Sequence, residues 1–300
     1  MNVFKENIKK DIKENIKYII STRSYKFRLN CYFDLDIIKD IPREKYFIIK
    51  KIRGRRRKDD EIINVNSHLR DGTLVRKVTI TLDNKEIISK KKKEFPNSKT
   101  FILFLIENGI EKLINFKVFD NGSIQMSGVK KIEQAFKTIE TFFKIVKDYS
   151  ILIEKKCIIM KNEGDIEIYC IPFLCNMSFN VGFMINREQL DEYININTGY
   201  KSHWEGVGYA AVRVYFPLEN FEENIKIYRI NFNGTWNYST ITYKKYLSIF
   251  IDEKIKKKYI TFHIFHTGKI NTSSIDDTVT FPYCDTFLDI LMESRKYIEV

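Results

Sequence analysis

The sequence is short of glycine, proline, histidine and paired cysteines, and each shortage excludes a class of protein. With 12 glycines and 5 prolines among 300 residues, of which 44% are hydrophobic, the chain is neither collagen-like nor disordered and can bury a core. The four histidines show no zinc-ligand spacing. We therefore expect no metal and no cofactor. Five cysteines, an odd number without a CxxC pair, favour buried free thiols in a reducing compartment: Cys31, Cys157, Cys170, Cys175 and Cys284.

Long apolar runs are missing as well. No stretch approaches the roughly 20 apolar residues that cross a bilayer, and residues 1–17 are studded with charge, unlike a secretory leader. We expect a soluble, intracellular protein with no membrane partner.

The charge is strongly unbalanced, with a net charge of +12 and a pI near 9.2. A fold does not need this excess, which favours an anionic partner such as nucleic acid, although general solubility is the alternative. Two basic runs, Arg53 with residues 55–57 and residues 90–93, fit solvated loops or else phosphate-contacting or localisation segments.

The chain contains an internal repeat. Residues 114–127 read INFKVFDNGSIQMS and residues 260–273 read ITFHIFHTGKINTS, an ungapped offset of 146. The matched pairs include Phe116 with Phe262, Phe119 with Phe265, and Gly122 with Gly268. Residues 30–35 similarly resemble residues 180–185. This spacing is too long for a solenoid, so we predict two related subdomains, 1–155 and 156–300.

Each half is predicted to hold a strand, a short helix, several strands, a hairpin and a long helix, which makes an α+β fold. Apolar spacing predicts long helices over 130–146 and 283–298, and short helices from about Asp36 and Asn186. Asn121-Gly122 predicts a two-residue turn with positive φ at both positions. Further strands are expected at 19–29, 74–82, 100–106, 173–183, 210–216 and 246–251, and charged insertions at about 50–95 and 220–258.

Alternation in the two hairpins places one large ring in each on a polar face. If Phe116 and Phe262 face the helices, Phe119 and Phe265 face the other way. Such rings either contact a partner or pack beneath a loop. The polar residues predicted to share their face are Asn115, Lys117, Gln125, Ser127, Thr261, His263, Asn271 and Ser273.

These residues resemble the TATA-box-binding protein family. Residues 118–130, VFDNGSIQMSGVK, are similar to its hairpin phrase [IV]-F-x-x-G-K-x-x-x-T-G-[AV]-[KR], and residues 265–270, FHTGKI, repeat it. The enlarged members encoded by large DNA viruses are the most similar kind. The resemblance implies two pseudo-symmetric repeats that form a curved, saddle-like antiparallel sheet, with helices on its convex face and DNA in its hollow.

The resemblance also implies site residues. Phenylalanine wedges enter the base stack in this family, which assigns that role to Phe119, Phe265, Trp204 and Phe95. Arg213 and Lys269 are the implied phosphate contacts. The sequence departs from the family where Gln125, Ser127, Asn271 and Ser273 stand in place of the family's Val and Thr at the groove floor. It also lacks, around residues 201–203, the glutamates that engage transcription factor IIB.

We therefore predict a transcription initiation factor, not an enzyme, that binds and bends double-stranded DNA in the minor groove at AT-rich promoters. RNA polymerase and factors similar to transcription factor IIB would be its partners, in the nucleus or in a viral factory in the host cytoplasm. One alternative is a protein-interaction scaffold that has lost DNA binding. Another is the nucleic-acid-binding module of a DNA- or RNA-processing enzyme, although no paired carboxylates stand at convincing catalytic positions and Asp276-Asp277 fits a helix start.

Overall fold

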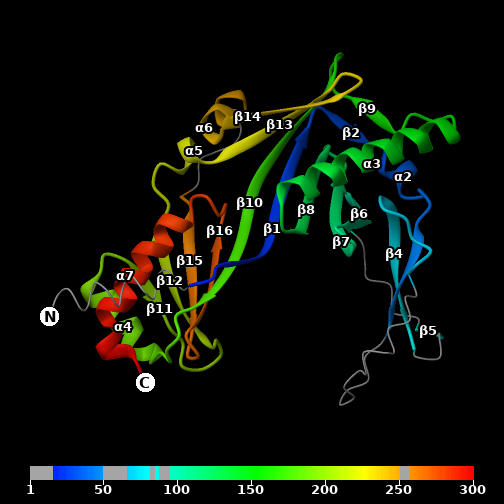
Figure 1. Cartoon of the computed structure of the whole chain (residues 1–300). Helices are drawn as coiled ribbons and strands as arrows, with labels where there is room; N and C mark the ends of the chain where they lie inside the picture. Colours follow the sequence, from blue (N-terminus) through cyan, green and yellow to red (C-terminus); the bar gives the residue numbers. More distant parts are fainter. Residues whose placement is uncertain (1–15, 50–65, 82–84, 88–94, 251–256) are drawn as a thin grey trace. The chain divides into compact units, whose positions relative to one another are not determined.

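The computed structural model describes residues 16–49, 66–81, 85–87, 95–250 and 257–300, which form two compact units (Figure 1). The N-terminal unit comprises Lys26–Tyr169 and Ile230–Asn237. The C-terminal unit comprises Cys170–Arg229, Tyr238–Val300 and the described part of Met1–Tyr25. The boundaries between these units fall inside strands β1, β10, β13 and β14. The basic runs at residues 53–57 and 90–93 lie outside the described residues.

The N-terminal unit is a sheet with one long helix on it. Its strands follow the order β1-β8-β7-β6-β4-β3, and α3 lies across β6, β7 and β8 (Figure 1). Its elements are β1 (Ile19–Leu29, of which the part from Lys26 belongs here), β2 (Cys31–Phe33), α2 (Leu35–Ile38), β3 (Glu44–Ile49), β4 (Thr73–Ile80), β5 (Glu86–Ile87), β6 (Ser98–Glu107), β7 (Ile110–Phe119), β8 (Ser123–Val129), α3 (Ile132–Leu152) and β9 (Ile158–Met160).

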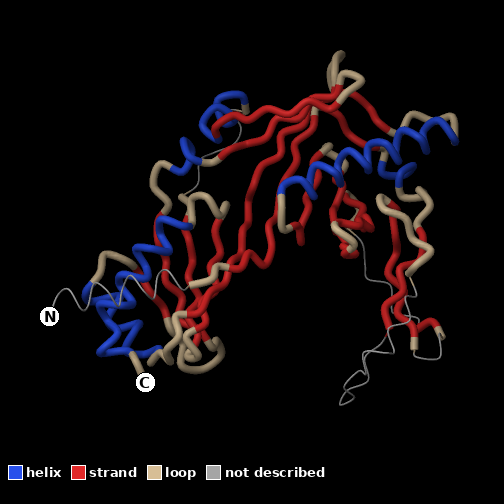
Figure 2. Tube along the Cα trace, viewed as in Figure 1, coloured by secondary structure: helices blue, strands red, loops and turns tan. Residues whose placement is uncertain are grey.

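The C-terminal unit has a comparable order, β11-β12-β15-β16-β10-β1, with α4 and α7 packed against each other (Figure 2). Its elements are β10 (Ile166–Asn180, from Cys170), α4 (Arg187–Asn197), β11 (Lys201–His203), β12 (Ala211–Pro217), α5 (Phe221–Asn224), β13 (Lys226–Phe232, as far as Arg229), β14 (Trp236–Thr242, from Tyr238), α6 (Tyr243–Ile249), β15 (Tyr259–Phe265), β16 (Lys269–Ser274) and α7 (Phe281–Ile298). The fold is thus α+β with extensive antiparallel pairing, as predicted, although β3 and β4 pair in parallel.

Aromatic side chains join helix to sheet in each unit. In the N-terminal unit, Phe142 of α3 lies 5.0 Å from Phe116 and 5.1 Å from Phe101, between ring centroids. In the C-terminal unit, Phe287 of α7 stacks on Phe262 at 4.3 Å. Burying rings of this size supplies about 1.5–3 kcal/mol each. These contacts fix which face of each sheet is covered by the long helix.

The two hairpins have the same register. Val118 pairs with Ile124 in one and Ile264 with Ile270 in the other. Each turn closes through a glycine amide that donates to the phenylalanine carbonyl three residues earlier, Gly122 to Phe119 at 3.1 Å and Gly268 to Phe265 at 3.0 Å. The predicted two-residue turn at Asn121-Gly122 is therefore wrong.

Side-chain chemistry explains this longer loop. Gly122 has a positive φ of 79°, but Asn121 is not among the positive-φ residues. The Asn121 carboxamide oxygen instead accepts from the Ser123 amide at 2.9 Å, which holds an Asx turn. The two-residue turn with two positive φ values is Asn108-Gly109, between β6 and β7.

Gly122 should tolerate no side chain. A Cβ there would lie 2.0 Å from the Cys31 carbonyl oxygen, and at Gly268 the equivalent atom would lie 2.1 Å from that of Phe183. We expect Gly122→Ala to lower the free energy of unfolding by about 3 kcal/mol, because backbone must move and φ is unfavourable. Gly109→Ala, with a φ of 75° and nothing within 4 Å of the new Cβ, should cost only about 1 kcal/mol. Equal losses in urea unfolding would contradict the close-approach explanation.

The helices follow the sequence pattern closely. The Asp34 carboxylate caps α2 and the Asn186 side chain caps α4, as expected for these residues at a helix start. The predicted strand at 246–251 is wrong: residues up to Ile249 belong to α6, where Thr242 accepts from the Lys245 amide at 3.2 Å and Tyr246 is fully buried. A short apolar run does not distinguish a strand from a helix.

The five cysteines are buried and free, as predicted. No helix among the described residues is long and apolar enough to cross a membrane.

Candidate nucleic-acid interface

The C-terminal unit has a polar sheet face opposite α7. Because paired residues share a face, two rows cross β11, β12, β15, β16 and β10. One row is Lys201, Tyr215, Thr261, Ser273 and Asn176; the next is His203, Arg213, His263, Asn271 and Ser178. Phe262 and Ile264, on the other face, are fully buried. The sequence thus placed Thr261, His263, Asn271 and Ser273 together, and the structure groups them in neighbouring rows.

The N-terminal unit has a corresponding polar face opposite α3. Its rows are Thr100, Lys117 and Gln125, and then Ile102, Asn115 and Ser127. Gln125 and Ser127 are exposed, and Asn115 and Lys117 are half-buried. The four predicted groove-face residues of this half therefore lie in two adjacent rows. We call these surfaces the polar faces of the two units.

Phe119 and Phe265 stand at equivalent positions. Each is the last residue of its strand, is half-buried, and shares strand parity with the polar face rather than with the helix-facing residues. Phe119 pairs with Ser98, and Phe265 pairs with Ala211. The structure therefore places both rings at the hairpin end of a polar face, and their role in DNA stays a prediction.

Phe95 lies closer to the hairpin end of the N-terminal polar face than its distance from Phe119 in the sequence suggests. Its ring is 66% exposed, and the Lys117 ammonium lies 5.5 Å from its centroid. The Asp120 amide donates to the Asn97 carbonyl at 3.1 Å, which ties the Phe95 loop to the hairpin that carries Phe119. Phe95 is therefore an exposed ring beside the N-terminal polar face.

Trp204 is half-buried, like Phe119 and Phe265, and its indole contacts α4, so its wedge role stays a prediction. The Arg187 guanidinium of α4 lies 5.6 Å from the Trp204 centroid, and the indole Nε1 is buried with no hydrogen-bond partner in the described residues. Tyr209, which the sequence analysis missed, adds another ring to the polar face: its hydroxyl lies 2.9 Å from Nδ1 of His263, and the residue is 40% exposed. Tyr209 lies two residues before Ala211, the strand partner of Phe265, and this pairing is seen only in the structure.

The two predicted phosphate contacts have different surroundings. Lys269 is exposed at the start of β16. The Arg213 guanidinium lies 5.4 Å from the Tyr209 ring centroid and 3.5 Å from the Glu205 carboxylate. Both cations are on the C-terminal unit, and Arg213 already has an internal anion beside it.

His263 lies in the middle of its row and is perturbed by its neighbours. Partial burial, and then the charge of Arg213, lower its pKa from the ordinary 6.5. The ring is therefore neutral at pH 7. Its Nδ1 contacts the Tyr209 hydroxyl, so Nε2 of the neutral ring, next to Asn271, is the nitrogen suited to hydrogen bonding with a base edge.

This shift predicts a pH-dependent stability. The unfolded chain binds a proton at His263 at a higher pH than the folded chain, so stability is complete above about pH 6.5 and falls as the pH drops through the lower folded-state pKa. Urea unfolding at pH 7.5 and 5.5 should show a smaller loss for His263→Gln than for the wild type. His68→Gln, which changes an exposed histidine, should keep the wild-type difference. An unchanged loss in His263→Gln would contradict the assignment.

Part of the N-terminal polar face is covered by the first insertion. Leu69, Val75 and Phe104 form a buried cluster, against which Tyr46, Ile102 and Leu113 pack. Phe104 and Leu113 form the row next to Ile102 and Asn115, so the open polar surface ends there. The Asn66 carboxamide accepts from the amide of Phe47 and donates to its carbonyl. It thereby covers the edge of β3 that does not pair with β4. The insertion is thus more than a charged surface loop.

The acidic pair Asp276-Asp277 has a structural role. Asp277 receives two hydrogen bonds from Arg23, at 2.7 and 3.1 Å, and Asp276 accepts from the Thr278 amide at 2.9 Å. Among the described residues, no group of three or more histidine, cysteine, aspartate or glutamate side chains gathers as metal ligands.

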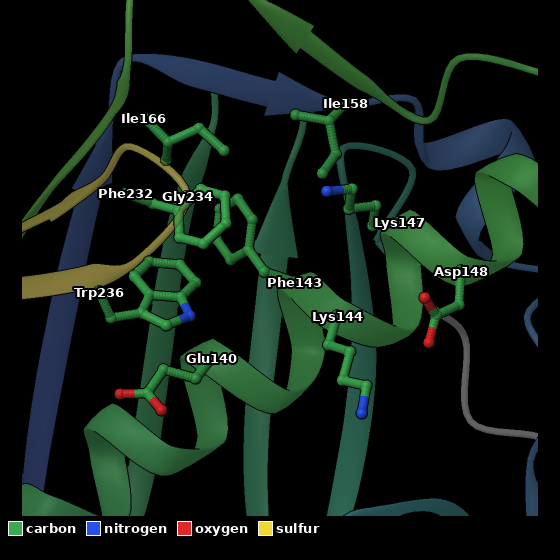
Figure 3. A pocket seen from close by; sticks show the side chains of 10 residues that line it. All are labelled: Glu140, Phe143, Lys144, Lys147, Asp148, Ile158, Ile166, Phe232, Gly234 and Trp236. Carbon is green, nitrogen blue, oxygen red and sulfur yellow. The ribbon is translucent and has the colours of Figure 1, made fainter.

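A cavity of about 410 Å³ lies on the helix side of the N-terminal unit, away from its polar face (Figure 3). The tip of the second insertion forms one wall: Trp236 lies 4.7 Å from Phe232 and 5.7 Å from Phe143 of α3, between ring centroids. Lys144 and Lys147 of α3 also line it. The tip of this insertion is therefore packed on α3.

Comparison with known proteins adds a distant relationship. No protein-family model matches the chain. It is 25% identical over 202 residues to a protein named TATA-box-binding protein-like from Acanthamoeba polyphaga mimivirus. The match covers 66% of this chain and 50% of that protein, so the chain spans about half the length of the curated relative. The viral relationship inferred from the hairpin phrases is supported to this extent.

Proposed function

We propose that the protein binds double-stranded DNA through the polar faces of its two units and acts in transcription initiation at AT-rich promoters. The observation that carries this proposal is the matched pair of polar faces, each with a phenylalanine at its hairpin end. Polar residues there offer hydrogen bonds to base edges, and Phe119 and Phe265 offer apolar wedges. The net charge of +12 supplies attraction to phosphates.

The proposal includes a doubled unit and the saddle that the family resemblance implies. Equal hairpin register, equivalent glycine contacts and comparable strand orders in the two units support a common origin. The name of the mimiviral relative supports the same assignment. RNA polymerase and factors similar to transcription factor IIB are proposed as partners on the resemblance alone.

Gel-shift competition tests the proposal. A labelled AT-rich duplex bound by the full chain should be displaced by unlabelled AT-rich duplex at a lower concentration than by GC-rich duplex of equal length. An AT-rich minor groove is narrower, more negative and free of the guanine amino group, which explains the preference. Equal displacement by the two competitors would remove the AT-rich promoter from the proposal, and no shift at low salt would overturn it.

A protein-interaction scaffold is the second candidate, because the packing of Leu69, Val75 and Tyr46 over part of the N-terminal polar face reduces the surface open to DNA. It predicts no gel shift with either duplex. We propose binding rather than catalysis, since the acidic pair is used in structural contacts. Cleavage of DNA or RNA by the pure protein would contradict this.

A further inference from the structure

The C-terminal polar face has a carboxylate at one end, a group that DNA phosphates would repel. Glu205 lies in the loop between β11 and β12, and its side chain is 51% exposed. Its Oε1 is 2.9 Å from Nε2 of His203 and 3.5 Å from Nη2 of Arg213. His203 and Arg213 are cross-strand partners in the row that continues to His263 and Asn271. The carboxylate thus occupies the cationic end of this row.

The ion pair between Glu205 and Arg213 is longer than a usual charge-assisted hydrogen bond. Charge-assisted N–H···O bonds are usually about 2.7–2.9 Å long, whereas this pair is at 3.5 Å. The guanidinium is placed over the Tyr209 ring, and its Nε is buried with no hydrogen-bond partner among the described residues. The Tyr209 ring therefore positions the Arg213 guanidinium, while the long contact with Glu205 leaves room for another anion to replace that carboxylate.

Glu205 is charged in this setting. The hydrogen bond from His203, and then the charges of His203 and Arg213, lower the pKa of its carboxyl. An ionised carboxylate and a phosphodiester offer the same chemistry to a guanidinium, namely a pair of anionic oxygens. The two anions are consequently competitors for one cation.

We infer that Glu205 is an internal substitute for a DNA phosphate, which holds Arg213 and His203 until a phosphodiester replaces it. This inference rests on the proposed DNA binding. Glu205 lowers affinity for any polyanion that cannot displace it, and it reduces the net number of phosphates that the C-terminal unit neutralises. Glu205 acts on DNA affinity through Arg213, so substitutions of these two residues should have non-additive effects on binding.

Glu205→Gln in the full chain tests this with fluorescence anisotropy on a labelled AT-rich duplex. The amide keeps the shape and the acceptor oxygen but removes the charge. We expect about tenfold tighter binding at low salt, and a plot of log affinity against log salt that is steeper by about 0.9, as for one additional neutralised phosphate. Glu188→Gln makes the same change on an exposed residue of α4 and should alter neither quantity.

A double-mutant cycle separates the specific contact from a general charge effect. In an Arg213→Ala background, Glu205→Gln should give no more than about a twofold gain, because the guanidinium that a phosphodiester would take over from Glu205 is gone. A full tenfold gain in that background would overturn the inference, and so would wild-type affinity and slope for Glu205→Gln alone. If the wild-type protein does not bind the duplex at all, the proposed function fails first. Thermal melting of each variant shows whether the fold is kept.

Discussion

Replacing Phe119 and Phe265 together by alanine is expected to leave a complex in which DNA is associated but nearly straight. Both rings end their strands on the polar face and are half-buried, so they are preorganised for insertion between bases. Stacking on an aromatic ring is worth about 1–3 kcal/mol per base, so each ring should account for about a tenfold to hundredfold change in affinity. The bend should be lost more completely than the association, because cationic contacts with phosphates remain.

Energy transfer between dyes at the two duplex ends measures the bend, and anisotropy measures affinity in the same samples. Phe281→Ala is the matched control, since Phe281 is 38% exposed but begins α7 on the helix side. It should leave both readouts unchanged. If the double variant bends DNA as the wild type does, these rings are not wedges; Tyr209 and Phe95 would then be the next side chains to replace.

Asn271→Glu is expected to weaken DNA binding by more than a hundredfold. Asn271 pairs with His263 in a central row of the C-terminal polar face, so a carboxylate there would face the phosphate-lined groove. At about 5 Å and an effective dielectric constant of about 20, one such repulsion costs about 3 kcal/mol. It would also replace an amide that can both donate and accept at base edges by a group that only accepts.

Thr286→Glu is the control for this charge. Thr286 is exposed on α7, so the variant has the same net charge but leaves the polar face intact. We expect a loss below about threefold, which reflects only the long-range field that salt screens. Similar losses for the two variants in anisotropy titrations would show that total charge, rather than this face, determines binding.

The hairpin faces could be predicted from sequence because alternation along a strand depends on local geometry alone. Phe116 and Phe262 each have a polar residue on either side, so the face of every neighbour followed once the apolar residues were assigned to the core. The long helices were predictable for the same reason, since their apolar stripes recur every three or four residues.

Features that depend on distant partners could not be predicted in this way. On the C-terminal unit, the Tyr209 hydroxyl contacts His263 of the polar face, and the Trp204 indole lies against Arg187 of α4. Nothing in the sequence near Trp204 predicts its contact with Arg187. The proximity of Phe95 to Phe119 likewise arises from strand pairing, because antiparallel β6 and β7 bring the start of one strand beside the end of the other.

Insertions were the least predictable part. Their charge suggested surface loops, yet Val75 and Leu69 bury Phe104, and Trp236 packs on Phe143. A few apolar residues in a charged segment are enough to dock it once a complementary surface exists, and that surface belongs to another part of the chain. The average composition of such a segment is dominated by its charged residues, so it does not reveal the few apolar ones that dock.

The most direct test of DNA binding by the polar faces is the affinity of the wild-type protein for an AT-rich duplex, measured over a salt series. We predict binding at low salt that falls linearly in log affinity against log salt, together with shortening of the end-to-end distance in the bound duplex. Absence of binding at about 50 mM salt, where phosphate contacts are strong, would contradict DNA binding by these faces.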